Sequence, residues 1–345
     1  MSSIIVTGGA GFIGFNFVRH VLAAEAETHV IVLDKLTYAG NPRSLATLAG
    51  EPRLSFVRGD IGDRALVAEL LAGRRPTAIV NFAAETHVDR SIVGPDDFID
   101  TNVVGTFRLL DETRKHLVAH PEDEARFRFL HVSTDEVYGA LGPDGAFDEA
   151  SPYAPSSPYS ASKAASDHLV RAYHHTYGVP VVTTNCSNNY GPYQFPEKLI
   201  PLTITQALRE RPLPVYGAGE NVRDWIHVED HCRAVLAALR RGRVGETYLI
   251  GARCERRNID VVRTICDELD RLRPLSGGES YRNLITFVTD RPGHDFRYAI
   301  NPARIERELG WRPQVGFVEG IRATIEWYID HGEWTQAIES GAHRE

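Results

Sequence analysis

A glycine-rich run between a strand pattern and a helix pattern constrains the fold of this 345-residue chain more than any other feature. Gly8, Gly11 and Gly14 follow the apolar residues 4–7 and lead into a helical pattern over residues 12–24. Glycine lets the backbone turn tightly and approach a pyrophosphate, and a helix N-terminus offers free N–H groups and a positive dipole end. The run therefore predicts a dinucleotide-binding strand–turn–helix unit.

Short apolar runs alternate with helical patterns through the first half of the chain. Continuous apolar strands are typical of a parallel sheet that is covered on both faces. The alternation predicts an α/β fold, a Rossmann-type doubly wound parallel sheet with a smaller C-terminal α/β substrate-binding lobe. Expected strands cover residues 4–7, 30–34, 54–60, 78–83, 127–133 and 179–184, and expected helices cover residues 12–24, 65–72, 102–116 and 159–177.

After Asn189, prolines and glycines separate shorter elements, and this change in composition predicts a second lobe. We expect residues 1–189 to form the dinucleotide-binding Rossmann domain and residues 190–345 to form mainly the substrate-binding lobe. Residues 224–250 are expected to return to the first domain, which would make the domains discontinuous. The acidic run at residues 121–124 is expected to be a solvated loop.

Charge, cysteine spacing and hydropathy exclude several classes of protein. The formal net charge of −8 argues against nucleic acid as a partner, because a phosphate backbone is normally met by a basic face. No apolar run reaches the ~18 residues of a membrane span, and the start of the chain lacks a signal-peptide pattern. Cys186, Cys232, Cys254 and Cys266 have no Cys-x-x-Cys spacing, so we predict reduced thiols, no metal site and a cytoplasmic protein.

The choice between NAD and NADP depends on Asp34, which ends the second expected strand. A carboxylate at this position can accept hydrogen bonds from both ribose hydroxyls and would repel a 2′-phosphate. NAD is therefore the predicted cofactor. Lys35 follows directly and weakens this argument, since its charge has the opposite sign.

Tyr159 and Lys163 lie four residues apart in an expected helix, so their side chains share one face. A free phenol titrates near pH ~10 and is a poor base at neutral pH. A nearby ammonium and a positive nicotinamide favour the phenolate, which could take a proton from a sugar hydroxyl as hydride leaves the carbon. Lys163 could also hold the nicotinamide ribose. A surface pair on a helix has the same spacing, and the dinucleotide motif upstream makes catalysis the better interpretation.

Three polar residues, Thr134, Asp135 and Glu136, directly follow an expected strand. Ligands bind at the carboxyl ends of the strands in open α/β sheets. Adjacent carboxylates usually mark a solvated turn. Together with Tyr159 downstream they favour another interpretation, because two carboxyl groups in one cleft can take acid and base roles.

Several motifs together resemble the dTDP-glucose 4,6-dehydratase family of the extended short-chain dehydrogenase/reductase superfamily. They are Ser-Thr-Asp-Glu-Val-Tyr-Gly at residues 133–139, Tyr-Ser-Ala-Ser-Lys at 159–163, and the runs at 186–193, 196–201, 222–225 and 290–295. The resemblance extends from residue 4 to about residue 338, and the Gly-x-x-Gly-x-x-Gly spacing is similar to that of the superfamily. It implies an NAD-dependent hydro-lyase that converts dTDP-glucose to dTDP-4-dehydro-6-deoxy-glucose for deoxysugar biosynthesis.

The resemblance also implies a mechanism. Tyr159 takes the C4 hydroxyl proton as hydride moves from C4 to NAD, and Thr134 hydrogen-bonds the C4 oxygen. Glu136 removes the C5 proton, which the new ketone has made acidic, and Asp135 protonates the departing C6 hydroxyl. Hydride then returns to C6, so NAD should stay bound. Thymidine is expected in place of uridine on the resemblance alone.

The contact residues follow from the same resemblance. Besides Gly8, Gly11, Gly14 and Asp34, those expected at NAD are Phe12, Ile13, Lys35, Leu36, Thr37, Asp60, Ile61, Phe82, Ala83, Ala84, Thr86, Thr101, Tyr159, Lys163 and Asn189. Those expected at the sugar nucleotide are Thr86, Thr134, Asn188, Lys198, Leu199, Pro214, Tyr216, Arg223, Asn258, Asp290, Arg291 and His294. Lys198 and Arg223 suit a diphosphate, because lysine offers a point charge and arginine a fork.

Other functions are compatible with part of this pattern. A sugar-nucleotide 4-epimerase would share Tyr159 and Lys163 but needs no acid–base pair to eliminate water, and a nucleotide-sugar decarboxylase needs a uronate pocket. A non-catalytic NAD-sensing protein would have no need of Tyr159, Lys163 or Glu136. The sequence leaves open whether the product feeds cell-surface rhamnose or secondary metabolites, and how Phe15 and the loop 251–254 affect packing and base preference. The family implies a homodimer formed through residues 102–116 and 159–177.

Overall fold

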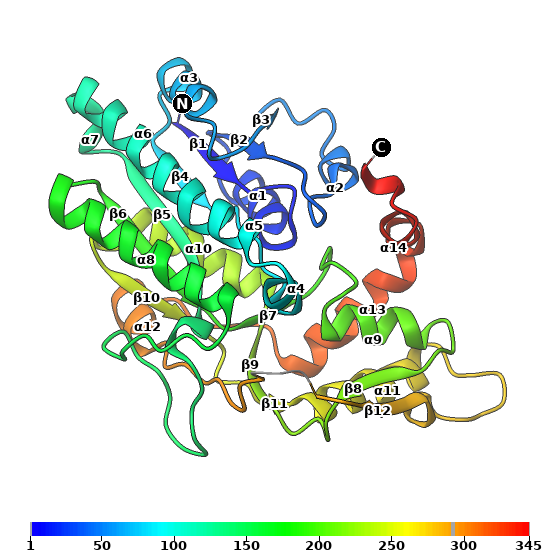
Figure 1. Ribbon diagram of the computed structural model, residues 1–345. Helices are drawn as coiled ribbons and strands as arrows, with labels where there is room; N and C mark the ends of the chain where they lie inside the picture. The colour runs from blue at the N-terminus through cyan, green and yellow to red at the C-terminus, as the bar shows by residue number, and fades with distance from the viewer. Residues whose placement is uncertain (1, 291–293, 345) are drawn as a thin grey trace.

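A seven-stranded parallel sheet forms the centre of the computed structural model, which describes residues 2–290 and 294–344 (Figure 1). The strand order is β10-β6-β5-β4-β1-β2-β3, and every neighbouring pair is parallel. The predicted Rossmann-type sheet is thereby confirmed. Its strands are β1 (Ser2–Thr7), β2 (Thr28–Asp34), β3 (Leu54–Arg58), β4 (Ala78–Asn81), β5 (Arg128–Thr134), β6 (Val181–Cys186) and β10 (Thr247–Ile250).

Helices cover both faces of this sheet, because successive strand residues point to opposite sides. Ile4 and Val6 of β1 join one apolar cluster and Ile5 joins the other. The first cluster lies under α1 (Phe12–Ala24), α10 (Val228–Arg241) and α12 (Ala303–Leu309), and the second lies under α3 (Arg64–Arg74), α6 (Thr106–Ala119) and α8 (Pro158–Tyr177).

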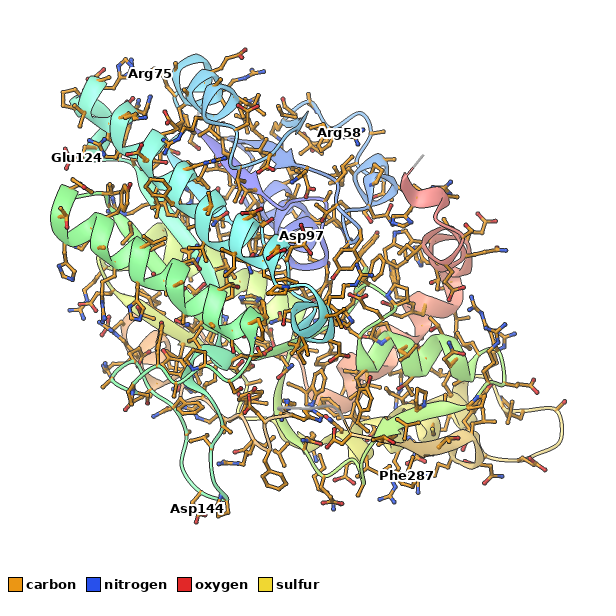
Figure 2. All side chains as sticks on the ribbon, in the orientation of Figure 1. Arg58, Arg75, Asp97, Glu124, Asp144 and Phe287 are labelled. Atoms are coloured by element: carbon orange, nitrogen blue, oxygen red, sulfur yellow. The ribbon has the colours of Figure 1, made fainter. Side chains whose placement is uncertain are left out.

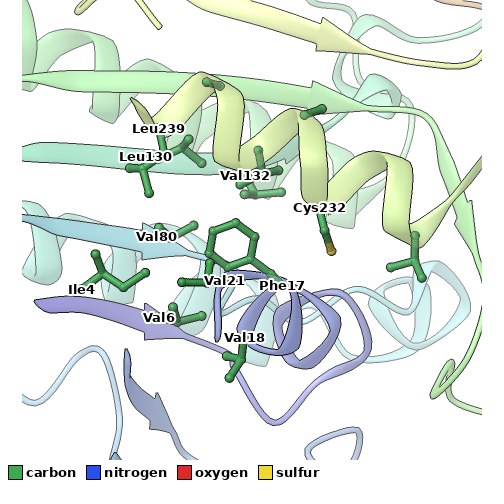
Figure 3. Close-up of a cluster of buried hydrophobic side chains, with 14 of the residues drawn as sticks. Ile4, Val6, Phe17, Val18, Val21, Val80, Leu130, Val132, Cys232 and Leu239 are labelled. Atoms are coloured by element: carbon green, nitrogen blue, oxygen red, sulfur yellow. The ribbon is translucent and has the colours of Figure 1, made fainter. Parts of the chain in front are cut away.

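The core on the α1 side holds the glycine-rich turn in place. Phe17 of α1 is fully buried and lies over the strands, and burial of such a side chain contributes about 1.5–3 kcal/mol. Figure 3 shows this cluster around Phe17, with Ile4, Val6, Val18, Val21, Val80, Leu130, Val132, Cys232 and Leu239. Since α1 and α10 pack against each other over the sheet, the start of α1 is supported from both sides.

The expected helix over residues 102–116 is divided in the structure. A π-helical turn, η1 (Ile99–Gly105), precedes α6. It directs Asn102 inward, where the amide accepts from the Glu85 N–H at 2.9 Å and donates to the Glu85 carbonyl at 3.0 Å and to Ser162 Oγ at 2.9 Å. A wider turn of this kind is frequent at functional sites, and a 3.6-residue hydrophobic period does not reveal it.

The acidic run at residues 121–124 is not the expected solvated loop. It forms a helical turn, α7 (Pro121–Glu124), in which Asp123 is only 1% exposed. The carboxylate of Asp123 is ion-paired with Arg75, at 2.8 Å, and with Arg126. The prediction of solvent exposure holds for the other three residues of the run and is wrong for Asp123, because its burial depends on Arg75, which lies 48 residues earlier.

A second lobe lies beside the carboxyl edge of the main sheet (Figure 1). Its sheets have the orders β11-β9-β7 and β12-β8, and α9, α11 and α13 supply most of its apolar core. The elements are β7 (Asn188–Tyr190), α9 (Leu199–Ala207), β8 (Leu213–Tyr216), β9 (Val222–His227), β11 (Glu255–Arg257), α11 (Asn258–Leu272), η3 (Tyr281–Leu284), β12 (Ile285–Val288) and α13 (Phe317–Asp330).

The remaining elements are short and lie at the ends of the main ones. They are α2 (Pro42–Ala46), α4 (Val88–Val93), α5 (Asp96–Phe98), η2 (Asp135–Tyr138), α14 (Gly332–Glu339) and η4 (Ala342–Arg344). Figure 2 marks Asp144 at the tip of the long loop between η2 and α8, and Phe287 on the surface of the second lobe. Within the described ranges, no helix is long and apolar enough to cross a lipid bilayer.

We propose a discontinuous division into domains, with residues 1–189 and 224–250 in the Rossmann domain and most of 190–345 in the second lobe. Two contacts support it. Strand β10 pairs with β6 at the edge of the main sheet, and α10 packs on α1. Strand β9 itself belongs to the three-stranded sheet, so residues 222–227 form the crossing between the lobes.

Candidate active site

A cavity of about 310 Å³ opens along the carboxyl ends of the central strands. It brings predicted cofactor and catalytic residues together from segments that are up to 190 positions apart in the chain. The predicted residues that line it are Gly8, Gly11, Phe12, Ile13, Gly14, Asp34, Lys35, Thr37, Asp60, Ile61, Phe82, Ala83, Ala84, Thr86, Thr101, Thr134, Asp135, Glu136, Tyr159, Lys163, Asn188, Asn189 and Lys198.

The glycine-rich turn, which we call the cradle, packs so closely against the backbone that side chains at Gly8 and Gly14 would collide with it. Gly8 has φ +66°, and a Cβ on Gly14 would lie 2.2 Å from the Gly8 carbonyl oxygen. Helix α1 starts after Gly11, which provides no side-chain cap. The N–H groups of the first turn therefore remain available to an anion, at the positive end of the helix dipole. This geometry fits the pyrophosphate of a dinucleotide.

Asp34 is held rigidly at the end of β2. Its two carboxylate oxygens accept the N–H groups of Ala10 at 2.9 Å and of Leu36 at 2.8 Å. Burial raises the pKa of Asp34, and these two hydrogen bonds oppose the increase. Lys35 forms an ion pair with Asp60 at 2.8 Å, so its charge is directed away from Asp34. Leu36 does not line the cavity and contributes its backbone N–H to Asp34.

The residues after β5 are placed by a side-chain cap. Thr134 Oγ1 accepts the Glu136 N–H at 3.2 Å and thereby starts the 3₁₀ turn η2. Asp135 is 2% exposed, and its Oδ2 has no hydrogen-bond partner in the part of the chain that the structure describes. Burial, followed by the charges of Glu136 and Asp224, raises the pKa of Asp135 well above its usual value. The charge of Arg223 opposes this increase, and the net shift favours the protonated form of Asp135, which can donate a proton.

Tyr159 and Lys163 both face the cavity from the first turns of α8. A capping box formed by Ser157 and Ser160 fixes the start of this helix. Lys163 Nζ donates to the Val132 carbonyl at 2.9 Å, and burial lowers the pKa of this lysine.

The pKa of Tyr159 is raised well above its usual value, first by burial and then by the charge of Glu136, and a hydrogen bond with Thr134 opposes the increase. A positive charge next to the phenol is therefore needed before Tyr159 can act as a base at neutral pH.

Three residues that the sequence analysis did not assign contact one another at the cavity, which Tyr38 and Glu197 line. Tyr38 donates its hydroxyl proton to Glu197 Oε1 at 3.0 Å, and the guanidinium of Arg90 lies 3.7 Å from the centre of the Tyr38 ring. Arg90 also reaches Glu197 Oε2 at 3.7 Å. We call these three residues the clasp. Glu197 stands next to Lys198 in one of the motifs that carried the resemblance, but nothing in the sequence indicated its partners.

The predicted sugar-nucleotide residues fall into two groups. Thr86, Thr134, Asn188 and Lys198 line the cavity. The others do not: Leu199 begins α9, Pro214 and Tyr216 belong to β8, Arg223 to β9, Asn258 begins α11, and Asp290 and His294 follow β12. Arg291 lies outside the described residues.

Three members of the second group, Tyr216, Asp290 and His294, contact one another in the second lobe. The rings of Tyr216 and His294 meet edge to face with their centroids 6.2 Å apart, and His294 Nδ1 lies 2.7 Å from an Asp290 oxygen. Arg223 is buried, donates to the carbonyls of Val222 and Asp295 at 2.7 and 2.9 Å, and packs against Tyr298. These contacts hold the Arg223 guanidinium at the edge of β9.

Among residues 2–290 and 294–344, no group of three or more His, Cys, Asp or Glu side chains could hold a metal ion. The four cysteines are free thiols. Phe15, whose effect the sequence left open, is fully buried with its ring edge to face with Tyr193, 4.7 Å between centroids. It therefore packs in the core beneath the glycine-rich turn.

Comparison with known proteins gives full-length matches. The model of the family described as GDP-mannose 4,6 dehydratase matches residues 5–324. A dTDP-glucose 4,6-dehydratase from Xanthomonas campestris is 58% identical over 345 residues, which are 100% of this chain and 98% of that protein.

Two solved structures of dTDP-glucose 4,6-dehydratases are similar over almost the whole chain. The enzyme from Streptomyces venezuelae, with NAD and dTDP bound, is 48% identical with a TM-score of 0.89, covering 97% of this chain and 99% of that one. The enzyme from Bacillus anthracis, in complex with NAD, is 44% identical with a TM-score of 0.87, covering 98% of this chain and 100% of that one.

Proposed function

The chain belongs to the NAD-dependent dTDP-glucose 4,6-dehydratases of the short-chain dehydrogenase/reductase superfamily, and we propose how its residues divide the reaction between them. The enzyme oxidises C4, eliminates water across C5–C6 and returns hydride to C6, giving dTDP-4-dehydro-6-deoxy-glucose. The observation that carries the proposed roles is the meeting of Asp135, Glu136 and Tyr159 in the cavity that also contains the glycine cradle.

The cradle, Asp34 and the clasp are the proposed holders of NAD. The first-turn N–H groups of α1 would bind the pyrophosphate, and Asp34 would accept the ribose hydroxyls, which is why NADP should bind more weakly. NAD, when bound, supplies the site with a hydride acceptor for C4 and later a hydride donor for C6. Because the cofactor ends each cycle unchanged, a clasp that retains it suits the reaction.

Tyr159 is the proposed base for the C4 hydroxyl. Its pKa is raised in the buried site, so the phenol acts only where Lys163 and the positive nicotinamide ring stabilise the phenolate. Thr134 lies within hydrogen-bonding reach of Tyr159 and would orient the same C4 oxygen. Lys163, buried below the phenol, would hold the nicotinamide ribose and keep a positive charge near Tyr159.

Asp135 and Glu136 are the proposed pair for the elimination. Once C4 is a ketone, the C5 proton is acidic, and Glu136 would remove it. Asp135 would protonate the C6 hydroxyl as it leaves, and its raised pKa favours the protonated form that this step needs. An epimerase has no step in which a hydroxyl group leaves, so a carboxylic acid next to Glu136 favours dehydration over epimerisation.

The substrate would span the two groups of predicted residues. The glucose would lie in the cavity at Thr86, Thr134 and Asn188, with Lys198 at the diphosphate. The nucleoside would extend toward Tyr216 and the other residues of the second lobe. A thymidine preference rests on the relatives, and a comparison of kcat/KM for dTDP-glucose and UDP-glucose tests it: a higher value for UDP-glucose would contradict the preference.

A homodimer in the cytoplasm is the proposed working form. Phe107 and Val118 of α6 are 36% and 72% exposed, and Tyr177 of α8 is 55% exposed, so both helices offer apolar surface to a second copy. Four free thiols suit a reducing compartment. Sedimentation of the purified chain at monomer mass would contradict the dimer.

Incubation of the purified enzyme with dTDP-glucose tests the function as a whole. We expect a product with the alkali-induced absorbance of a 4-keto sugar, with no net consumption of NAD. Asp34→Asn is the companion variant for the cofactor, and it should narrow the preference for NAD over NADP. Formation of dTDP-galactose, or of no product from any nucleotide glucose, would overturn the proposal.

A further inference from the structure

A buried carboxylate lies beneath the catalytic residues, and the steps above give it no role. Asp167 stands on α8, four residues after Lys163, and is 5% exposed. Its Oδ2 accepts hydrogen bonds from Ser133 Oγ at 2.8 Å, Tyr153 OH at 2.9 Å and Asn185 Nδ2 at 3.3 Å. Several donors at one oxygen stabilise the ionised carboxylate. Although burial opposes it, the pKa of Asp167 is lowered, first by the neighbouring His131 and then by the charge of Lys163 and the hydrogen bond from Ser133.

His131 faces the other oxygen of this carboxylate, with Nε2 3.3 Å from Asp167 Oδ1. On the far side of the ring, His131 Nδ1 lies 3.1 Å from Asn81 Nδ2, and Asn81 Oδ1 accepts the hydroxyl proton of Thr7 at 2.6 Å. An amide nitrogen only donates, so Nδ1 accepts and the ring proton is on Nε2. Burial lowers the pKa of His131, so the ring is neutral, and its Nε2–H donates to Ser166 Oγ at 3.2 Å next to Asp167 Oδ1, which has no hydrogen-bond partner among the described residues.

Asp167 stands one helical turn after Lys163, on the same face of α8. Burial lowers the pKa of Lys163, and Asp167 is the largest of the effects that oppose this decrease. Besides His131, the titratable groups that face the pair from neighbouring elements are Tyr138 of η2, Tyr153 of the preceding loop and Cys186 of β6. Burial raises the pKa of each of these three, so all of them are neutral at pH 7. The ammonium of Lys163 therefore meets one nearby negative charge.

The same carboxylate is connected to the acid–base segment. Ser133, which donates to Asp167, immediately precedes Thr134 at the end of β5. Asn185 Nδ2 donates both to Asp167 and, at 3.1 Å, to the Thr134 carbonyl oxygen. Asp167 thus joins α8 to β5 and β6 at the point where η2 begins with Asp135.

We propose that Asp167 is a positioning residue for oxidation at C4: its buried carboxylate keeps Lys163 in the ammonium form below Tyr159 and anchors the end of β5 that presents residues 134–136. The proposal rests on the proposed role of Tyr159 as the base. Asp167 does not line the cavity, so it acts through Lys163 and Ser133 and not on the substrate.

Asp167→Asn tests this inference, because it preserves the shape and removes the charge. Lys163 then loses its proton at a lower pH, the phenolate of Tyr159 loses its stabilising cation, and the base form of Tyr159 appears only at higher pH. We expect kcat to fall about 10-fold or more. In the pH profile of kcat, the acidic limb should lie about one pH unit higher. KM for dTDP-glucose should stay within about 2-fold, since no substrate contact is removed.

Two further variants separate this role from a structural one. Asp123→Asn makes the same change at a buried, ion-paired carboxylate at the other end of the sheet, and should lower stability without moving the acidic limb. Tyr153→Phe removes one donor from Asp167 but leaves its charge in place and less neutralised, so the acidic limb should move slightly to lower pH, and this variant tests the inference even if Asp167→Asn does not fold.

The inference is overturned if the limb in Tyr153→Phe, and in folded Asp167→Asn, coincides with that of the wild type. It is also overturned if Asp167→Asn lowers kcat by the same factor in a Lys163→Met enzyme as it does in the wild type. Asp167 would then act independently of Lys163. A wild-type enzyme that forms no 4-keto product would instead contradict the proposed function.

Discussion

Asp135 lies buried beside Glu136, and after burial the negative charge of Glu136 is the largest of the effects that raise the pKa of the Asp135 carboxyl. Asp224, on β9, is the second negative charge that raises this pKa. Elimination of water requires a proton donor and a proton acceptor within reach of one sugar ring. This arrangement favours the protonated form of the Asp135 carboxyl, because the carboxyl is buried next to two other carboxyl groups.

Asp224→Asn should therefore move the alkaline limb of kcat to lower pH. Asp224 is fully buried, and burial raises its pKa to about 6, so it is negatively charged above that pH. Removing this charge lowers the pKa of Asp135, which then loses its catalytic proton at a lower pH. A pH–rate profile of the variant measures the shift, and a limb that stays in place or moves upward would contradict the assignment of Asp135 as the acid.

Tyr159→Phe should reduce turnover about 10²-fold or more, because a positioned base is typically worth that factor. The ring remains to fill the space against Phe98, so NAD affinity should change little. Single-turnover formation of NADH and calorimetric binding of NAD separate the two effects. Turnover within a factor of two of the wild type would show that another group takes the C4 proton.

Gly14→Ala should weaken NAD binding at least about 10-fold. The added Cβ would lie 2.2 Å from the Gly8 carbonyl oxygen, so the turn that faces the pyrophosphate must move. Gly73→Ala in α3 is the matched control, since no atom lies within 4 Å of its new Cβ, and alanine in a helix is favoured over glycine by roughly 0.5–1 kcal/mol. Equal NAD affinity in both variants would show that the cradle does not contact the cofactor.

Glu197→Gln should accelerate exchange of bound NAD. The Glu197 carboxylate contacts both Tyr38 and Arg90, and an uncharged amide binds both partners more weakly. The contacts between the three segments of the clasp should therefore weaken. Exchange against isotopically labelled NAD provides the rate, and kcat at saturating NAD should be nearly unchanged. An exchange rate equal to that of the wild type would show that Tyr38, Arg90 and Glu197 do not retain the cofactor.

Local motifs explain why so much of the site could be predicted from the sequence. The glycine cradle, Asp34 and the pair Tyr159–Lys163 are each contained in a short segment whose backbone geometry follows from residue spacing. The parallel sheet was predictable because its buried strands are continuous apolar runs between helical patterns. In these segments the chemistry and the local fold depend on the same few residues.

The features that were missed depend on contacts between distant segments. Tyr38, Arg90 and Glu197 are individually ordinary polar residues, and only the tertiary fold brings them together. Asp167 stands in the sequence as one more polar position of a helix, and its role depends on His131 and Asn185 from two strands. No periodicity or spacing within one segment carries that information.

Glu136→Gln tests the central claim most directly, because it separates dehydration from simple oxidation. Glu136 is proposed to act only after the C4 ketone has formed, so the variant should still reduce bound NAD, with the near-ultraviolet absorbance of NADH. It should then stall, since loss of a positioned base costs ~10²–10⁴-fold in rate. Formation of the 4-keto-6-deoxy product and exchange of the C5 hydrogen with heavy water should both be slow.

The same experiment on the wild-type enzyme provides the reference for both rates. The account predicts that Glu136→Gln accumulates NADH while incorporating little solvent deuterium at C5. Product formation at the wild-type rate, or deuterium incorporation at C5 as fast as in the wild type, would contradict the assignment of Glu136 as the base for elimination.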